Sequence, residues 1–332
     1  MGVIALNRKT IIVLIILLLG IVVVSWYSQT AKQQEYRILT ISTTTSLYDT
    51  GLLEEAIAPA FKEKTGIVIR FIPKGTGAAI QDAKNGLADA IIVHARNKEV
   101  KFMEEGYGVN RKVIAYNFFV VVGPKDDPAG IRGLNPVEAL KKMVEAGRAG
   151  KAVWVSRDDG SGTNTKEVVL WEMAGFDYNE IKNEKWFRCT GTGMGKTLLY
   201  TNNIRAYTLS DIGTYLKYYK DGLIDLDVSV DKGEELINIY SIIVVNPKKF
   251  DKDFEGAMIL VEWLVSDGQK IIGEYGVDKY GRPLFYPIVD ILEKGSGTLF
   301  DWIVKYGFID DNGVMTECPK KYRYKADTVF FE

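Results

Sequence analysis

The sequence predicts an α/β fold with two lobes joined by two long hinge strands and preceded by an apolar N-terminal segment. From Tyr36 onward, short β-rich runs alternate with helical patterns, which is typical of βαβ units and a mainly parallel sheet. Two long β-rich runs, 113–122 and 236–245, bracket a middle segment. A chain that leaves one lobe and later returns must cross the hinge twice, so these runs are the predicted hinge strands.

The first elements follow one pattern, in which a strand is succeeded by a polar or glycine turn and then by a helix. Strand 37–42 leads into a helix that ends at Gly66. Pro59 lies inside this helical pattern and predicts a kink, because proline has no N–H for the helix ladder. The remaining predicted elements are, in order, strand 67–72, a helix that ends near Gly86, strand 90–93, a helix capped by Asn135 with Pro136 at its first position, strand 152–155, a helix through Trp171, a helix after Gly195 and strand 206–209.

Length and charge limit the classes of function. The 332 residues are 47% hydrophobic and 26% charged, so the chain can bury a sizeable core and is long enough for two ordinary domains. The 42 basic residues nearly cancel the 43 acidic ones, which leaves a formal net charge of -1 and no basic footprint for nucleic acid. Any bound anion must therefore be held by local groups.

The chain has few residues of the kinds that ligate transition metals. Cys189 and Cys318 lie far apart in sequence and His94 is the only histidine, so we predict no metal site and no cofactor. A hydrolase would need a nucleophile, a base and a group that orients the base, and a single imidazole gives little support to such a site. We therefore predict that the protein is not an enzyme. Sequence spacing leaves open whether the two thiols pair.

The N-terminal segment 1–30 carries an export signal. Arg8 and Lys9 precede an apolar run, 11–24, which is followed by the interfacial aromatics Trp26 and Tyr27. The small-residue context for cleavage is poor, which favours an uncleaved membrane anchor over a removed signal peptide. The positive flank places residues beyond about 30 on the outer face of the cell membrane, anchored, secreted or periplasmic.

Three strand-to-helix turns share the features of an anion site. Each lies where a strand ends and a helix begins, and unpaired N–H groups with a partial positive charge attract anions there. Glycine lets the backbone approach a ligand, and hydroxyls add donors. Because Ser and Thr are also ordinary helix caps, one such turn alone shows little. The predicted binding residues in these turns are Thr44, Thr45, Ser46, Gly75, Thr76, Gly77, Ser161, Gly162 and Thr163.

Arg157 is the predicted charge partner of the anion, since its planar fork supplies several donors to a multi-oxygen ligand. The alternative is a salt bridge to Asp158 or Asp159, which could orient Arg157 or cap the following helix. His94 ends an apolar run, so a structural role is favoured over a general base.

The segment 191–197 is similar to a phosphate-binding P-loop but lacks one of its residues. That motif needs glycine five positions before the Gly195-Lys196 pair, and Thr190 stands there. An exported protein also has little access to ATP, so an NTPase is not predicted.

An ordered set of motifs runs through most of the chain. Its members are Thr43-Thr44-Thr45-Ser46 with Thr50-Gly51-Leu52-Leu53, Gly75-Thr76-Gly77, 88–95 (ADAIIVHA), 156–167 (SRDDGSGTNTKE) with Trp171, Gly193-Met194-Gly195 and 207–215 (YTLSDIGTY). Taken together, these motifs resemble the tungstate-binding proteins of ABC importers over roughly 38–287. The resemblance implies a type II periplasmic-binding-protein fold, a bound tungstate or molybdate oxyanion, and ABC permease and ATPase subunits as partners.

The chain departs from the pattern of this family at positions that bear on the choice of anion more than on the fold. Members commonly have threonine at Leu47, glycine at Asp158 and histidine at Asn164. An aspartate expected after Asn117 is Phe118, and an expected arginine is Ile212.

We therefore expect one lobe over 36–117 plus 240–290, a second lobe over 118–239, and a C-terminal extension, 291–332, of unassigned role. The anion is expected between the lobes and is most simply tungstate. Asp-Gly-Ser-Gly-Thr at 159–163 also resembles phosphate-binding proteins of the same fold, which keeps phosphate as an alternative. A membrane-tethered anion sensor is a second alternative, and an exported hydrolase is the least supported.

Overall fold

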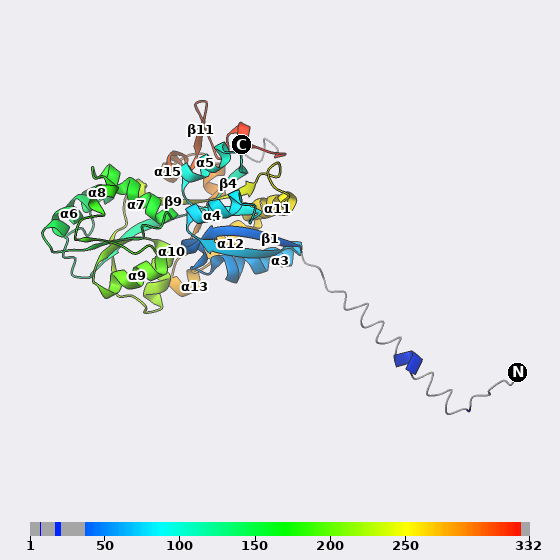
Figure 1. Cartoon of the computed structure of the whole chain (residues 1–332), viewed down its shortest axis with the longest axis horizontal. Coiled ribbons are helices and arrows are strands. Elements are labelled where there is room, and N and C mark those ends of the chain that lie inside the picture. The colour runs from blue at the N-terminus through cyan, green and yellow to red at the C-terminus, as the bar shows by residue number, and fades with distance from the viewer. Residues whose placement is uncertain (1–6, 8–16, 21–36, 327–332) are drawn as a thin grey trace. The chain divides into compact units, whose positions relative to one another are not determined.

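A ten-stranded sheet with helices on both faces organises the chain in the computed structural model (Figure 1). The structure describes residue 7, residues 17–20 and residues 37–326. The sheet lies within the compact unit Ile38–Glu332, which is distinct from Met1–Arg37. The predicted anchor or signal segment 1–30 lies almost wholly outside the described residues. Among the residues that are described, no helix combines the length and apolar character needed to cross a membrane.

Strands and helices alternate along most of the described chain, as the sequence predicts. The strands are β1 (Ile38–Thr44), β2 (Val68–Lys74), β3 (Ala90–Val93), β4 (Gly108–Gly123), β5 (Trp154–Ser156), β6 (Phe187–Cys189), β7 (Tyr207–Asp211), β8 (Asp227–Val230), β9 (Ile237–Val245), β10 (Tyr286–Pro287), β11 (Ile309–Asp311) and β12 (Val314–Thr316). The α-helices are α2 (Thr45–Tyr48), α3 (Ala58–Thr65), α4 (Thr76–Lys84), α5 (Arg96–Glu104), α6 (Pro136–Arg148), α7 (Gly162–Met173), α8 (Tyr178–Ile181), α9 (Met194–Asn203), α10 (Ile212–Lys220), α11 (Phe254–Leu264), α12 (Asp267–Glu274), α13 (Val277–Tyr280), α14 (Val289–Lys294) and α15 (Thr298–Gly307).

The prediction of a mainly parallel sheet is wrong for its middle. The strand order is β2-β1-β3-β9-β4-β7-β5-β6, with β8 and β10 also paired to β4. The outer pairs β2-β1, β1-β3, β7-β5 and β5-β6 are parallel, but β3-β9, β9-β4 and β4-β7 are antiparallel. The reason is topological, because the two long strands cross the sheet in opposite directions as the chain leaves and returns.

The two long strands connect the halves of the sheet. β4 pairs with β9 from Gly108↔Val245 to Phe118↔Ile237, then continues beyond β9 and pairs with β7 and β8. We call the part around β1, β2 and β3 the β1 side, and the part around β5, β6 and β7 the β5 side. The lobe boundaries inferred from sequence remain a prediction.

Each side has its own hydrophobic core on both faces of the sheet. On the β1 side, Leu39 and Ile41 pack in one cluster and Ile91 and Val93 in another. On the β5 side, alternate residues of β4 point to opposite faces: the Val121 side chain joins Trp154 and Trp171, and its neighbour Val122 joins Leu198. Figure 1 shows α6, α7 and α8 gathered at this side and α3, α4 and α11 at the other.

The segment around Pro59 changes helix type. Residues Leu52–Ile57 form a π-helix that begins after Gly51, which has the left-handed conformation. The α-helix α3 follows directly from Ala58 and has Pro59 in its first turn. The kink at Pro59 stays a prediction. The predicted end at Gly66 is confirmed, since this residue has a φ of 74°.

The cap predicted at Asn135 is also confirmed. Its side-chain oxygen accepts from Glu138 N at 2.9 Å, and Pro136 begins α6.

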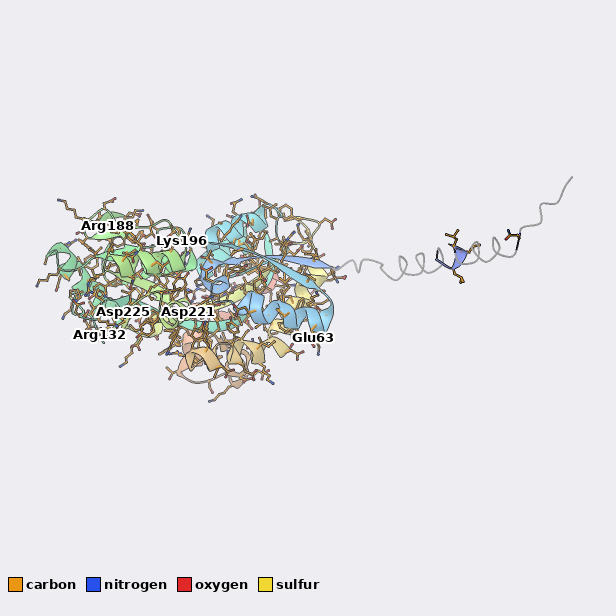
Figure 2. All side chains as sticks on the ribbon, turned by 90° about the horizontal axis from the view of Figure 1, so that it is seen from below. Glu63, Arg132, Arg188, Lys196, Asp221 and Asp225 are labelled. Atoms are coloured by element: carbon orange, nitrogen blue, oxygen red, sulfur yellow. The ribbon has the colours of Figure 1, made fainter. Side chains whose placement is uncertain are left out.

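Of the two cysteines, Cys189 is exposed and Cys318 is buried, and both are free. Charged side chains of both signs lie on the surface, as Figure 2 shows for Glu63, Arg132 and Arg188, which fits the near-zero net charge.

The C-terminal extension is bound to the β1 side by a buried ionic cluster. Arg111 on β4 and Glu99 on α5 form an ion pair at 2.8 Å, with both side chains 1% exposed. The same guanidinium donates to Glu317 O and Gly307 O in the extension. The Glu317 carboxylate in turn accepts from Lys112 Nζ and from Val113 N. Residues up to Arg323 are therefore part of the folded body.

We predict that Arg111→Ala lowers the free energy of unfolding by about 3–5 kcal/mol, because it leaves the Glu99 carboxylate buried without its cation. The matched control is Arg205→Ala, which breaks an exposed pair with Asp126 and should cost less than about 1 kcal/mol. Urea unfolding followed by tryptophan fluorescence measures both. Equal losses for the two variants would show that the buried cluster does not anchor the extension.

Candidate anion-binding site

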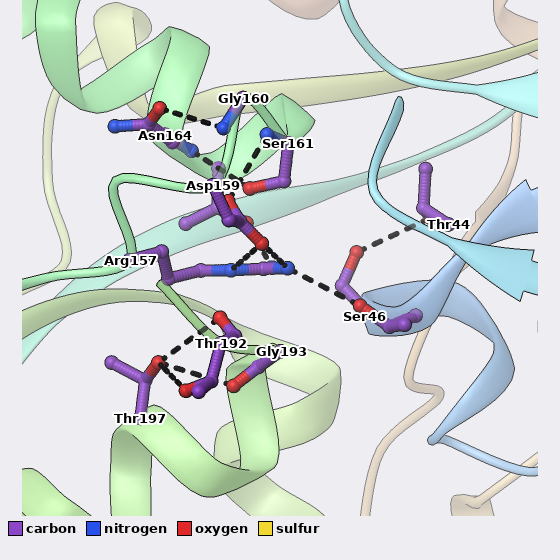
Figure 3. A network of polar contacts seen from close by, with 12 residues as sticks. Thr44, Ser46, Arg157, Asp159, Gly160, Ser161, Asn164, Thr192, Gly193 and Thr197 are labelled. Atoms are coloured by element: carbon purple, nitrogen blue, oxygen red, sulfur yellow. Dashed lines mark hydrogen bonds and ion pairs between the residues drawn. The ribbon is translucent and has the colours of Figure 1, made fainter. Parts of the chain in front are cut away.

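The structure brings the three predicted turns together at the junction of the two sides. Gly75, before α4, faces the loop before α7 so closely that a β-carbon on it would lie 3.5 Å from Asp159 O and 3.7 Å from Ser161 Cα. Across the same junction, Arg157 Nη2 donates to Thr45 Oγ1 at 3.2 Å. Figure 3 shows the Arg157 side chain between the β5-side loop and the turn that carries Ser46. Side chains from both sides thus share one buried space.

Arg157 is the central cation of this site and is only 2% exposed. Its Nη2 and Nε atoms donate to Asp159 Oδ2 at 2.6 and 3.2 Å, and its Nη1 donates to Thr163 Oγ1 at 3.4 Å. The salt bridge considered from sequence therefore exists, and it involves Asp159. Asp158 has a φ of 41° and its carboxylate instead accepts from the Tyr178 hydroxyl. The guanidinium still directs donors toward Thr45 and Thr163 while it is paired.

The turn after β1 presents two buried hydroxyl groups, those of Thr44 and Ser46. Thr44 caps the short helix α2, since Leu47 N donates to its Oγ1 at 3.4 Å. Ser46 is fully buried, and its Oγ donates to Thr44 Oγ1 at 3.3 Å (Figure 3). These caps are ordinary local structure, and the hydroxyl between them, that of Thr45, is the one that contacts Arg157.

The turn after β2 contains a buried hydroxyl that lacks a partner. Thr76 is the first residue of α4, and Gly75 before it supplies no side-chain cap. Thr76 Oγ1 is buried, yet it has no hydrogen-bond partner among the described residues. An unpaired buried hydroxyl costs roughly 1–3 kcal/mol, so this atom indicates a ligand position. The first N–H groups of α4 also lack partners within the helix.

The turn before α7 combines a cap with a close approach between the two sides. Ser161 Oγ accepts from Asn164 N at 3.2 Å, and Ser161 N donates to Asp159 Oδ1 at 3.1 Å. Gly162 packs against the ring of His94 on the β1 side, and a β-carbon there would lie 2.4 Å from Nε2. Any other residue at position 162 would place its β-carbon against the His94 ring, so the observed junction requires glycine there.

A buried carboxyl supports the loop that carries Arg157. Glu167 Oε1 accepts from Trp154 Nε1 at 2.7 Å, and its Oε2 accepts from Ser156 Oγ at 2.6 Å. Ser156 Oγ accepts from Asp158 N, which orients the start of the loop. Burial raises the pKa of Glu167 to about 7, although its hydrogen bonds lower it.

Two further turns contribute to the site but were absent from the predicted residue set. Gly193 begins α9 and faces Thr45, with a β-carbon position 3.5 Å from Thr45 Oγ1. Thr214 on α10 donates from Oγ1 to Ser46 O at 3.2 Å. Both follow a strand and precede a helix, so the strand-to-helix pattern used for the other three turns could have found them.

The candidate P-loop segment forms one of these turns and differs from a nucleotide site. Gly193 caps α9, and Thr197 Oγ1 donates to Gly193 O at 3.1 Å (Figure 3). Lys196, which a P-loop would direct at a phosphate, is exposed on the surface (Figure 2).

Titratable groups near Arg157 are buried and partly neutralised. Burial raises the pKa of Asp211 to about 6, against the lowering effects of Thr214 donors and of Arg157. Burial lowers the pKa of His94 to about 4. His94 stacks on Tyr240 with ring centroids 4.7 Å apart and lies within hydrogen-bond distance of Ser46 and Asn238. No cluster of three or more His, Cys, Asp or Glu residues suited to a metal ion occurs in the described part of the chain.

Comparisons with known proteins show the family to which the chain belongs. The family described as "PBP superfamily domain" matches residues 28–268. The tungstate-binding protein TupA of Peptoclostridium acidaminophilum is 40% identical over 261 residues, which cover 77% of this chain and 87% of that relative.

Two solved structures are also similar. The structure of the tungstate-binding protein TupA from Desulfovibrio alaskensis G20 is 38% identical in sequence and has a TM-score of 0.63. The match covers 76% of this chain and 98% of the TupA chain. A structure described as the tungstate ABC transporter from Geobacter sulfurreducens is 42% identical in sequence and has a TM-score of 0.63. The match covers 71% of this chain and 97% of the Geobacter chain.

We predict that Glu167→Gln changes how stability depends on pH. Because the pKa is raised on folding, the folded state binds more protons than the unfolded state between about pH 4.5 and 7. The contribution of Glu167 is therefore present below pH 4.5 and is lost as pH rises through 7. From pH 5 to pH 8, the free energy of unfolding of the variant should therefore rise by roughly 2–3 kcal/mol relative to that of the wild type. Urea unfolding at both values measures this difference, and a constant difference would contradict the raised pKa.

Proposed function

Because the chain belongs to the PBP superfamily and, within it, to the family of TupA solute-binding proteins, we propose that it captures tungstate or molybdate for an ABC transporter. Tungstate is the preferred ligand in this proposal, and an ABC permease and ATPase subunits are the partners. The protein binds and releases its ligand without catalysis. It acts outside the cell membrane, to which its segment 1–30 anchors it.

The observation that carries the proposal is a buried guanidinium at the same junction as a buried hydroxyl that has no partner. Arg157 is almost fully buried, and the hydroxyl of Thr76 has no partner among the described residues. A tetrahedral oxyanion has several acceptor oxygens and no donor when it is fully deprotonated. Such a ligand offers an acceptor to the Thr76 hydroxyl and a negative charge to the guanidinium.

The anion is held from both sides of the junction in this proposal. The β1 side, with the predicted lobe 36–117 plus 240–290, provides hydroxyls and helix N–H groups, and the β5 side, with lobe 118–239, provides the guanidinium and the start of α7. Donors on both sides bind the closed arrangement better than an open one, so ligand binding favours closure. The ligand-binding residues are Thr44, Thr45, Ser46, Gly75, Thr76, Gly77, Arg157, Ser161, Gly162 and Thr163.

The carboxylates near Arg157 favour a fully deprotonated anion over phosphate. A protonated phosphate needs an acceptor for its proton, and Asp158 or Asp159 are the candidates on the loop. Asp159 already accepts from Arg157 and from Ser161 N, and Asp158 accepts from Tyr178 and lies 3.6 Å from Lys182 Nζ. Both carboxylates are already engaged by donors or cations of the protein, which favours a fully deprotonated ligand such as tungstate or molybdate in this proposal.

Calorimetric titration of the full-length chain with tungstate, molybdate, sulfate and phosphate tests the function. We predict that tungstate binds tightest and that Arg157→Ala weakens its binding by about 2–5 kcal/mol, since a buried charged donor is lost. Arg205→Ala, far out on the surface, is the control and should bind as wild type does. If phosphate binds tightest, the tungstate assignment is wrong and the phosphate alternative replaces it. If no oxyanion binds, the proposed function as a whole is wrong.

We predict that Thr76→Val weakens tungstate binding by about 1–3 kcal/mol without lowering the free energy of unfolding of the ligand-free protein. The physical reason is that this hydroxyl has no protein partner to lose. Ser229→Ala is the matched control, because Ser229 on β8 is also buried with an unpartnered hydroxyl but belongs to none of the site turns. Titration and urea unfolding measure the two quantities. Unchanged affinity in Thr76→Val would place the anion elsewhere.

A further inference from the structure

A chain of buried hydrogen bonds connects the long strands to Ser46 in the candidate site. Asn117 on β4 lies opposite Asn238 on β9. Asn117 Nδ2 donates to Leu284 O at 3.3 Å, and Asn238 Nδ2 donates to Asn117 Oδ1 at 2.8 Å. Asn238 Oδ1 lies 2.7 Å from His94 Nδ1, and His94 Nε2 lies 3.3 Å from Ser46 Oγ. All four side chains of the chain are buried.

The first acceptor in this series of hydrogen bonds fixes which atom is the donor in each of the others. Leu284 O is a backbone carbonyl and can only accept, so the amide nitrogen of Asn117 must face it. The Asn117 oxygen then faces Asn238, and the Asn238 oxygen faces His94. A second donation from Asn238 Nδ2 to the Tyr240 hydroxyl, at 2.9 Å, fits this orientation. His94 Nδ1 therefore carries a proton, and Nε2 of the neutral ring is an acceptor.

Ser46 then has a single proton and more than one acceptor for it. While His94 is neutral, the Ser46 hydroxyl must donate to Nε2 to leave no buried nitrogen unpaired. Ser46 Oγ is also a donor toward the site, where it lies 3.3 Å from Thr44 Oγ1. If Ser46 donates into the site, Nε2 loses its donor, at a cost of about 1–3 kcal/mol for a buried polar atom. A proton on Nε2 removes this conflict.

The charges that face His94 also change when a dianion enters. Arg157 and Asp159 lie beside the ring from the loop before α7 and already neutralise each other, and Lys166 lies beyond them on α7. The other neighbours are the Tyr240 and Phe119 rings, from β9 and β4, and the backbone of Gly162. Burial holds the pKa of His94 near 4 in the ligand-free protein. A bound dianion is an added opposite charge in a dry site and raises that pKa.

We propose that His94 takes up one proton from solvent when the site binds its dianion, so that the ring donates to Ser46 and the Ser46 hydroxyl donates to the anion. His94 is then a positioning residue, and binding of the anion is coupled to pH. The inference rests on the proposed function and adds the mechanism by which a nearly neutral site accepts two negative charges.

The single histidine of the chain makes a direct test possible. Full-length protein labelled with 15N-histidine and purified without a histidine tag gives one imidazole in long-range 1H–15N spectra. At pH 7 we expect the neutral ring with its proton on Nδ1 in the free protein, and both nitrogens protonated once tungstate saturates it. A neutral ring in the saturated complex would overturn the inference. If tungstate does not bind at all, the proposed function fails instead.

Calorimetry gives an independent measurement. In buffers of different ionisation enthalpy, tungstate binding should take up as much as one proton, and affinity should fall by roughly tenfold per pH unit between the His94 pKa of about 4 in the free protein and its higher pKa in the complex. In His94→Gln both effects should disappear, because the new amide cannot titrate. Proton uptake that persists in His94→Gln would assign it to another group, such as Asp211, and overturn the proposal. Thr76→Val, which changes the site but not the imidazole, should bind more weakly with the same proton uptake.

Discussion

The buried ion pair between Arg157 and Asp159 is the interaction on which the candidate site depends. A guanidinium that is 2% exposed would be strongly destabilising without a partner, and Asp159 provides that partner at 2.6 Å. Because the two charges offset each other, the pair as a unit is nearly neutral. An entering anion therefore meets oriented donors more than it meets net positive charge, in a protein whose formal net charge is only -1.

The geometry around this pair follows from the order of the strands. β1, β5 and β7 are far apart in sequence, but β4 and β9 join their halves of the sheet and align the ends at which helices begin. Each of these ends brings hydroxyls and free N–H groups at little cost, because the same atoms also serve as helix caps. Glycines at the junction, above all Gly162 against His94, let the two sides approach until those donors share one space.

The sequence predicts the parts of this arrangement that depend on a few neighbouring residues. The strand-to-helix turns at Ser46, Thr76 and Ser161 are such parts, and so are the caps at Asn135 and Gly66. These features are local, since a glycine or hydroxyl acts on the next turn of chain. The prediction of the type II fold depends on the ordered set of motifs, because no single hydrophobic periodicity identifies that fold.

Long-range features could not be obtained in the same way. The antiparallel middle of the sheet depends on which strands become neighbours, and the choice of Asp159 over Asp158 depends on the positive φ of Asp158, which turns its carboxylate to Tyr178. Gly193 belongs to a motif of the family resemblance and to a segment similar to a P-loop, but it was not among the predicted binding residues. Its position opposite Thr45 in the folded chain adds it to the site.

The C-terminal extension shows the same contrast between strong buried contacts and weak exposed ones. Its buried contacts, through Arg111 and Glu317, are made with the β1 side. Toward the segment before β9 it offers the Lys305–Glu234 pair, in which the lysine is 57% exposed, and such pairs contribute little. The extension therefore stabilises mainly the β1 side. The two sides are joined at the site, where Arg157 meets Thr45 and Lys98 Nζ donates to Gly160 O at 2.6 Å, and beside it, where Lys217 Nζ donates to Asp49 O at 2.6 Å.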